Sequence, residues 1–311
     1  MSILHITNGG RLTKNLVELD IPGEILTWDE MLCEGPTTEI IDSESFLNQR
    51  KTFFSTVYGL EFDAEKYYAD INKLNTPENY TEIILWFEQD LFCYINLIAV
   101  ISLLQEKKIA LPLYLVSSGK DNGHAPFKVL DELSQTQLLK LYDKKIQLTA
   151  ADIDTAVTLW RTYCGKDHNL LKLYIKKTSS FLYLSNCLKA HLERFPETKS
   201  GLSVLEFNIL KIIKESDIKS KHHLLGYILN YQGFYGFGTI QINRLIEELA
   251  LFFDEDDGRI QLNRKGHVAL LNQSSFASEI NNNMTYGGVY RLDYQFSKQQ
   301  NKLIKTPTNA N

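Results

Sequence analysis

The sequence has 311 residues, of which 44% are hydrophobic and 23% are charged, and its formal net charge is −5. This composition is typical of a globular protein of one or two domains, and the slight acidity argues against nucleic-acid binding through bulk positive charge. The longest apolar run, residues 91–104, is too short to span a bilayer and contains Asn96. The start, MSILHI, has neither a basic region nor a cleavage motif, so we expect a cytoplasmic protein without membrane attachment.

The four cysteines show no CxxC motif and no paired spacing. This pattern argues against a disulfide framework and against a zinc module, and it predicts reduced, mostly buried thiols. Cys33 stands in a polar loop, so a nucleophilic role there is the alternative. No residue spacing matches a metal site, and no motif identifies a cofactor.

Residues 1–124 alternate between strand and helix patterns, which predicts an α/β domain with a mainly parallel sheet and flanking helices. Strands are expected at residues 3–7, 24–28, 82–87 and 111–118, and helices at residues 44–59 and 91–108.

The rest of the chain divides into three parts. Residues 125–199 show helical apolar stripes and are interpreted as a helical connecting segment. Residues 200–295 show three helical patterns, a strand, an Asp-Gly turn and a second strand, which predicts a winged-helix-like α+β domain. The polar residues 296–311 are expected to form a flexible tail.

Ligands of open parallel sheets bind beyond the carboxyl ends of the strands, near helix N-termini. Polar, charged or glycine residues follow all four expected strands, so we predict a ligand site at that edge. Its expected ligand contacts are Asn8, Gly9, Gly10, Arg11, Trp28, Asp29, Glu34, Gly35, Ser117 and Ser118. The Asn8-Gly9-Gly10 stretch lacks the spacing of dinucleotide and P-loop motifs. It either turns backbone N–H groups toward an anion, with Arg11 adding charge, or forms a plain turn.

Glu88 and Asp90 are the candidate catalytic residues. A carboxylate such as Glu88 at the end of a buried strand loses hydration unless a partner or ligand compensates. Asp90 stands at the expected N-cap of the next helix, so capping is its alternative role. Trp28 and Trp86 either stack on a ligand ring or close the edge of the sheet. His5 alternates with apolar neighbours, which predicts a hydrogen-bonded core histidine, with a ligand contact or a general base as alternatives.

The winged-helix outline raises a DNA-binding hypothesis that the charges disfavour. Residues 202–270 contain eight Lys and Arg against nine Asp and Glu, and the expected recognition helix at 239–253 has Arg244 as its one cation. Phosphate binding normally needs cations clustered on one face. We therefore prefer the hypothesis that this region binds a protein partner or packs against another domain of the chain.

These pieces together resemble the bacterial family called domain of unknown function 1835. Its members show HI-x-NGD near the N-terminus, then IPG, Trp and EGP, and then W-x-E-x-D. The matching residues here are His5-Ile6-Thr7-Asn8-Gly9, Ile21-Pro22-Gly23, Trp28, Leu32, Glu34-Gly35-Pro36, Trp86, Glu88 and Asp90. Residues 188–210 and 287–294 resemble the family's helix-to-winged-helix junction and its closing strand, so the resemblance covers nearly the whole chain.

One departure from the family pattern concerns the site. The family usually has an aspartate after Asn-Gly, and this chain has Gly10 there. If that acid bound a metal or acted as a base, this chain lacks the role or supplies it from Asp29, Glu88 or Asp90. No activity is established for the family, so the resemblance implies an architecture and no reaction.

The sequence thus favours a protein that binds a nucleotide or another phosphorylated small molecule at the carboxyl edge of the sheet. If the site is catalytic, hydrolysis or group transfer with Glu88 as general base is the simplest scheme. One alternative is a ligand-responsive regulatory or adaptor protein whose winged helix binds DNA or a protein partner. Another is a scaffold without a ligand, in which the polar strand ends only cap helices.

Overall fold

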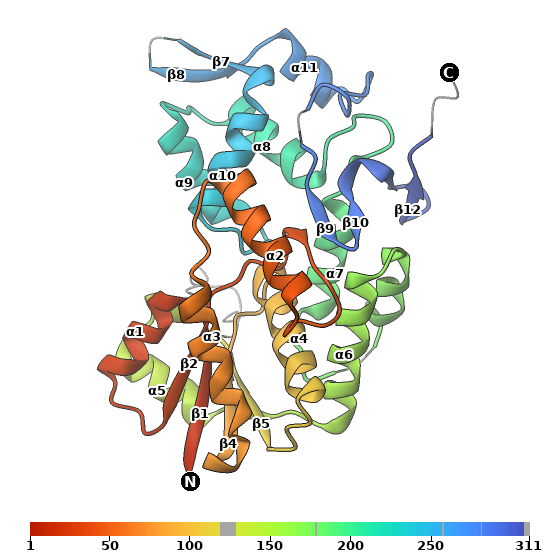
Figure 1. The fold of residues 1–311 in the computed structure, drawn as a ribbon. Coiled ribbons are helices and arrows are strands. Elements are labelled where there is room, and N and C mark those ends of the chain that lie inside the picture. Colours follow the sequence, from red (N-terminus) through yellow and green to blue (C-terminus); the bar gives the residue numbers. More distant parts are fainter. Residues whose placement is uncertain (119–128, 178, 257, 281, 308–311) are drawn as a thin grey trace.

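The computed structural model describes residues 1–118, 129–177, 179–256, 258–280 and 282–307 (Figure 1). A five-stranded sheet with the strand order β2-β1-β4-β5-β6 forms the centre of its N-terminal part. The first four strands in this order are parallel, and β6 is antiparallel to β5. The strands are β1 Ser2–Asn8, β2 Glu24–Trp28, β4 Tyr80–Trp86, β5 Leu113–Val116 and β6 Ile146–Gln147. The predicted α/β class with a mainly parallel sheet is confirmed.

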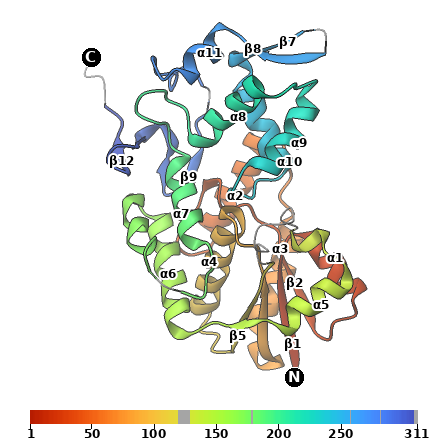
Figure 2. The ribbon, with the colours of Figure 1, turned by 180° about the vertical axis from the view of Figure 1, so that it is seen from behind.

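Helices cover both faces of this sheet (Figures 1 and 2). On one face, α1 (Gly10–Glu18) and α5 (Gln135–Asp143) bury a small cluster that includes Leu12 and Trp86. On the other face lie α3 (Ala64–Asn72) and α4 (Leu91–Glu106). Nearly every residue of α4 is buried, because the helix also packs against α6 (Ala150–Cys164) and α7 (Leu184–Glu193). We call the sheet and its helices, including α2 (Glu44–Phe53), the α/β unit.

The C-terminal unit lies beyond the carboxyl ends of the strands (Figure 1). It contains α8 (Val204–Glu215), α9 (Lys221–Tyr231), α10 (Thr239–Glu248), the antiparallel hairpin β7 (Phe253–Asp256) and β8 (Arg259–Leu262), and α11 (Arg264–Leu270). Each of the first two helices begins after a serine whose side chain accepts a backbone N–H, as expected for an N-cap. Three helices and a hairpin therefore follow one another in the predicted order.

A small sheet links the two units. The two-residue strand β3 (Gly35–Pro36) pairs in parallel with β9 (Thr285–Gly287), which pairs with β10 (Val289–Tyr290). The remaining short elements are a π-helical turn at Phe54–Tyr58 and 3-10 turns at Lys73–Asn75, Pro77–Asn79, Leu130–Glu132, His168–Tyr174, Ala250–Phe252 and Arg291–Asp293.

Two expectations about the chain's organisation are corrected. Residues 125–199 were expected to be a helical connecting segment, but in its first described part Leu130–Glu132 form a 3-10 turn, and α5 begins only after Ser134, which is extended and caps the helix. Residues Ile146–Gln147 then join the sheet as β6, so the sheet continues into the expected connecting segment. The expected boundary between residues 124 and 125 falls outside the described residues.

The second correction concerns the expected tail from residue 296. Within the described residues, β11 (Tyr294–Ser297) pairs with β12 (Lys302–Lys305) in an antiparallel hairpin. Phe296 and Leu303 are both buried, which the polar composition of this stretch concealed. The alternation of two apolar residues with polar neighbours is enough to give this hairpin a buried face.

Candidate functional site

The predicted ligand edge lies where the strand order reverses. The chain connects β1 to β2 on one side, whereas β4 lies on the other side of β1. In open α/β sheets this reversal leaves a crevice beyond the carboxyl ends of the two central strands. The structure brings the ends of β1, β2, β4 and β5 to one edge, facing the C-terminal unit (Figure 2).

The N-terminus of α1 is open at this edge. Gly9 has φ 100°, a conformation that favours glycine, and its N–H donates to the Trp28 carbonyl at 3.0 Å. Among the described residues, no acceptor pairs with the N–H groups of Gly10, Arg11 or Leu12, and no side chain caps the helix. A Cβ at Gly9 or Gly10 would meet nothing within 4 Å. Free N–H groups at the positive end of a helix dipole form an anion-binding arrangement.

Arg11 adds an exposed cation beside this terminus. Its side chain is 69% exposed and pairs loosely with Asp131, with 3.5 Å between Nε and Oδ2. Exposed pairs of this kind contribute little to stability, so the guanidinium is available to an arriving anion.

At the N-terminus of α4, by contrast, other groups of the protein accept the first N–H groups of the helix. Asp90 Oδ1 accepts from the N–H of Cys93 at 2.8 Å, which confirms the predicted N-cap. The carbonyls of Phe234 and Tyr235 accept the N–H groups of the next two helical residues, Leu91 and Phe92, at 2.8 and 3.1 Å. No N–H group of this turn remains for a ligand.

The carboxyl group of Asp90 is also covered by Gly236 of the C-terminal unit. Gly236, with φ 68°, lies so close that a Cβ there would be 2.1 Å from the Asp90 carboxyl carbon. Burial raises the pKa of Asp90 to about 6. The structure therefore places this candidate catalytic acid in a structural role between the two units.

Glu88 is buried in a pocket of hydrogen-bond donors. Ser118 Oγ donates to its Oε2 at 2.5 Å, and the N–H of Leu130 donates to its Oε1. Burial raises the pKa of Glu88 to about 8, so the carboxyl group is largely protonated at pH 7. That state is opposite to the one required of a general base. Ser117 accepts from the side-chain amide of Gln89 at 2.6 Å, so both serines at the end of β5 already have partners.

His5 and Trp86 are not available to a ligand at this edge. Both are fully buried, and the indole N–H of Trp86 donates to His5 Nδ1 at 3.1 Å. The other ring nitrogen of His5 faces the Pro22 carbonyl at 3.3 Å, and burial lowers the pKa of this histidine, so it is neutral. Trp86 stacks in parallel on Tyr142 of α5. His5 thus lies hydrogen-bonded in the core, as the first of its predicted roles requires, and both rings, which were proposed as ligand contacts, are fully buried against each other.

Asn8 and Trp28 also face inward. The Asn8 side chain donates to Cys93 Sγ at 3.1 Å and accepts from Asn96 of α4 at 2.8 Å. Trp28 is 2% exposed, and its indole N–H has no partner among the described groups. Asp29 remains accessible and pairs with Lys66 of α3 at 2.9 Å.

Glu34 and Gly35 belong to the junction between the units. Glu34 is 1% exposed and accepts from Arg244 Nη2 at 2.7 Å, from Gln241 Nε2 at 3.2 Å and from the Tyr58 hydroxyl. Gly35 has φ 84°, and a Cβ there would be 2.6 Å from Arg50 and from Phe53. The EGP motif therefore joins the units, and its predicted ligand contacts lie inside the protein.

Sequence reasoning missed the two arginines that complete this junction. Arg50 is fully buried and donates to Glu30 Oε2 at 3.0 Å and to the carbonyls of Glu34 and Met31 at 2.8 and 3.1 Å. Arg244 also pairs with Glu248 one helical turn later in α10. Neither arginine stands in a motif, and the buried acids that they meet, Glu30 and Glu34, lie 20 and 210 residues away in the sequence.

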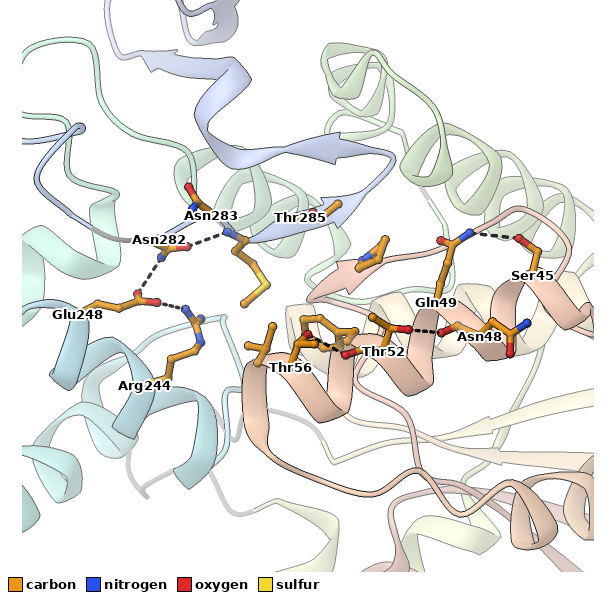
Figure 3. Close-up of a pocket in the computed structure, with 14 residues that line it drawn as sticks. Ser45, Asn48, Gln49, Thr52, Thr56, Arg244, Glu248, Asn282, Asn283 and Thr285 are labelled. Atoms are coloured by element: carbon orange, nitrogen blue, oxygen red, sulfur yellow. Dashed lines mark hydrogen bonds and ion pairs between the residues drawn. The ribbon is translucent and has the colours of Figure 1, made fainter.

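A cavity of about 870 Å³ lies beside this junction, between α2 and the C-terminal unit (Figure 3). At one end, Asn282 donates to Glu248 at 2.8 Å, and Glu248 pairs with Arg244. Along the other side lie uncharged polar side chains, namely Ser45, Asn48, Gln49 and Thr52 of α2 and Thr56 of the π-helical turn that follows it. Because two carboxylates already balance Arg244, this cavity suits an uncharged polar molecule better than a phosphate.

Among the described residues, no group of three or more His, Cys, Asp and Glu side chains is placed to hold a metal ion. The described helices include none that is long and apolar enough to cross a membrane.

Comparisons with known proteins add little to this geometry. No protein-family model and no curated protein matches the sequence. Among solved structures, the chain is similar to the DNA-binding, cleavage and re-ligation domain of Plasmodium falciparum topoisomerase II, with 12% identity and a TM-score of 0.43. The match covers 82% of this chain and 42% of that chain. A similarity at this level carries no argument about function.

Proposed function

We propose that this protein binds a phosphorylated small molecule, such as a nucleotide, at the carboxyl edge of its sheet. The phosphate binds the free N–H groups of Gly10, Arg11 and Leu12, and the Arg11 side chain closes over it. The observation that carries the proposal is the open N-terminus of α1 at the strand-order reversal. The neighbouring terminus of α4 serves as an internal contrast, since protein carbonyls already occupy it.

The proposal concerns binding and assigns no reaction. Glu88 is the candidate general base at the end of β4, but its raised pKa of about 8 means that the carboxyl group keeps its proton at neutral pH. A general-base step would first require Glu88 to lose that proton.

Membership of the family called domain of unknown function 1835 is part of the same proposal. It rests on the motifs around Asn8, Glu34 and Glu88. If the chain belongs to this family, Gly10 at the first position of α1 replaces the family's aspartate. The first turn of the helix then contains no carboxylate. A phosphate then meets no fixed negative charge at that position.

Substitutions at Gly10 test the phosphate site directly. Gly10→Asp places a carboxylate at the helix N-terminus, which should stabilise the fold by about 0.3–1 kcal/mol. If this carboxylate lies about 6 Å from a bound phosphate, their repulsion at an effective dielectric constant of about 20 is about 3 kcal/mol, or about a hundredfold in Kd. Gly10→Ala fits the free space and is the matched control.

The measurements are calorimetric titration and thermal shift with ATP, AMP and glucose 6-phosphate. At least one probe should bind the native chain and Gly10→Ala with similar Kd, and bind Gly10→Asp about a hundredfold more weakly. A ligand at about 100 times its Kd should stabilise the fold by about 2.7 kcal/mol. The proposal fails if no probe binds, or if Gly10→Asp binds as tightly as Gly10→Ala.

A winged-helix-like C-terminal unit that binds DNA is the alternative function, and the position of α10 disfavours it. The inner face of α10 contacts Glu34 through Gln241 and Arg244. Its exposed residues, Thr239, Ile240, Asn243 and Glu247, include no cation. A recognition helix needs cations on its exposed face to meet the phosphates, so we favour packing between the units as the role of α10. Salt-dependent binding to duplex DNA would support the alternative instead.

A further inference from the structure

A second cavity, of about 440 Å³, opens at the carboxyl end of β2 between α3 and the C-terminal unit. The lining includes Thr27, Asp29 and Glu30 at the end of β2, and Gly236, Gly238 and Gln241 of the C-terminal unit. Neither the N-terminus of α1 nor Glu88 lines it. It is therefore separate from the proposed phosphate site.

The walls of this cavity are rich in carboxylates. Asp29, Glu30, Glu61, Asp63 and Asp70 line it, and Lys66 is the one lining cation among the described residues.

Internal ion pairs neutralise part of this charge. Arg50 pairs with Glu30, Lys66 with Asp29, and Lys73 with Asp70. Glu61 and Asp63 have no salt-bridge partner among the described residues, so the walls keep a negative excess. An anion would be repelled here, and a cation would be attracted.

One buried oxygen in the cavity wall has no partner. Glu30 is 5% exposed, and its Oε2 accepts from Arg50 at 3.0 Å. Its Oε1 is buried and accepts no hydrogen bond from any described group. A buried carboxylate oxygen without a donor is unfavourable by about 1–3 kcal/mol, so an N–H donor from a ligand would remove that cost.

Aromatic side chains complete the cavity. Phe54, Phe62, Tyr67 and Phe92 line it, and the ring centroid of Phe62 lies 5.8 Å from that of Phe54 and 5.6 Å from that of Tyr67. Aromatic faces attract cations and also accept the apolar body of an organic molecule.

We propose that this cavity binds a primary organic ammonium ion with an apolar body, its –NH₃⁺ group donating to Glu30 Oε1 and Asp29 and its body packed against Phe62. The exposed Asp29–Lys66 pair is weak enough to be displaced by such a cation. This inference does not depend on the phosphate site.

The test uses the full chain at low salt with 2-phenylethylamine, measured by calorimetric titration. Its uncharged analogue 2-phenylethanol has nearly the same shape. The amine should bind saturably, and the alcohol should bind at least about tenfold more weakly, a difference of about 1.4 kcal/mol. Raising the salt to about 0.5 M should weaken binding of the amine and leave that of the alcohol unchanged.

Variants locate the site. The doubly substituted chain Asp29→Asn, Glu61→Gln should bind the amine at least about fivefold more weakly, because both carboxylates are accessible and removable without breaking the core. Glu44→Gln, a surface acid outside the cavity, should bind like the native chain. Glu30→Gln removes the charge but keeps a side-chain oxygen for Arg50, and it should weaken amine binding further.

The proposal is overturned if the alcohol binds as tightly as the amine, or if the double variant retains native affinity. The Gly10→Asp variant, which should lose phosphate binding, is also titrated with the amine. It should leave amine binding unchanged, so the failure of one site can be told from the failure of the other.

Discussion

Removing Arg244 should destabilise the whole protein, because this side chain neutralises two carboxylates at the junction of the units. Arg244 Nη2 lies 2.7 Å from Glu34 Oε1, and Nη1 pairs with Glu248. Glu34 is 1% exposed, so its carboxylate has no water to replace the lost partner. Breaking a buried ion pair by removing one member typically costs about 3–5 kcal/mol, and we expect Arg244→Met to fall in that range.

The destabilisation caused by Arg244→Met should also depend on pH, which gives a second test of the ion pair. Burial raises the pKa of Glu248 to about 7, and the Arg244 guanidinium opposes that rise. Without the guanidinium the pKa of Glu248 rises further, so the folded variant retains a proton that the unfolded chain releases. The deficit relative to the native chain should therefore be larger at pH 8 than at pH 5.5, where Glu248 is protonated in both folded proteins.

The assay is urea unfolding at both pH values, with the m-value checked for two-state behaviour. Lys221→Met is the matched control, since Lys221 pairs with Glu247 on the exposed side of α10 at 2.8 Å. That surface pair should contribute no more than about 1 kcal/mol. If Arg244→Met is as stable as Lys221→Met, the Glu34 junction does not hold the units together and our account of the EGP motif is refuted.

Two further substitutions test the strand ends. Because the pKa of Glu88 in the fold is about 8 and its ordinary value is 4.5, stability should fall by up to about 1.4 kcal/mol for each pH unit between about 5 and 8. Glu88→Gln has no such proton, so its stability relative to the native chain should increase over that range in thermal unfolding; a constant difference would contradict the raised pKa. Gly236→Ala should be about 2 kcal/mol more destabilising than Gly233→Ala, because both glycines have positive φ but only Gly236 contacts Asp90. Equal losses in urea unfolding would show that the contact with Asp90 is unimportant.

The local elements of the α/β unit could be predicted because their signals are local. The strand Glu24–Trp28 has the predicted bounds, and α4 starts after its predicted cap Asp90. The helical pattern expected from residue 125 includes Leu130 and Leu133, but Leu130–Glu132 form a 3-10 turn and Leu133 is extended, so α5 begins only after Ser134. Periodicity reports which residues are apolar, and the cap decides where the helix begins.

The positions of the strand ends were predictable, but their partners were not. Glu34 meets Arg244, 210 residues later, and Asp90 meets Gly236, 146 residues later. No spacing rule connects such pairs, since their proximity depends on how the C-terminal unit packs. A buried chain of hydrogen bonds from the Cys33 carbonyl through Arg194 and His191 to His168 is hidden from the sequence for the same reason.

The edge that was predicted as one ligand site is divided by these contacts into regions of different chemistry. The helix α1 presents free N–H groups, which favour an anion, whereas the cavity beyond β2 presents carboxylates around Glu30, which favour a cation. Between them, Asp90 and Glu34 are used to attach the C-terminal unit. A substitution at Asp90 or Glu34 would therefore change stability before it changed binding. Substitutions at Gly10 and Asp29, which are accessible and make few contacts, are the ones whose effect on affinity can be assigned to a ligand.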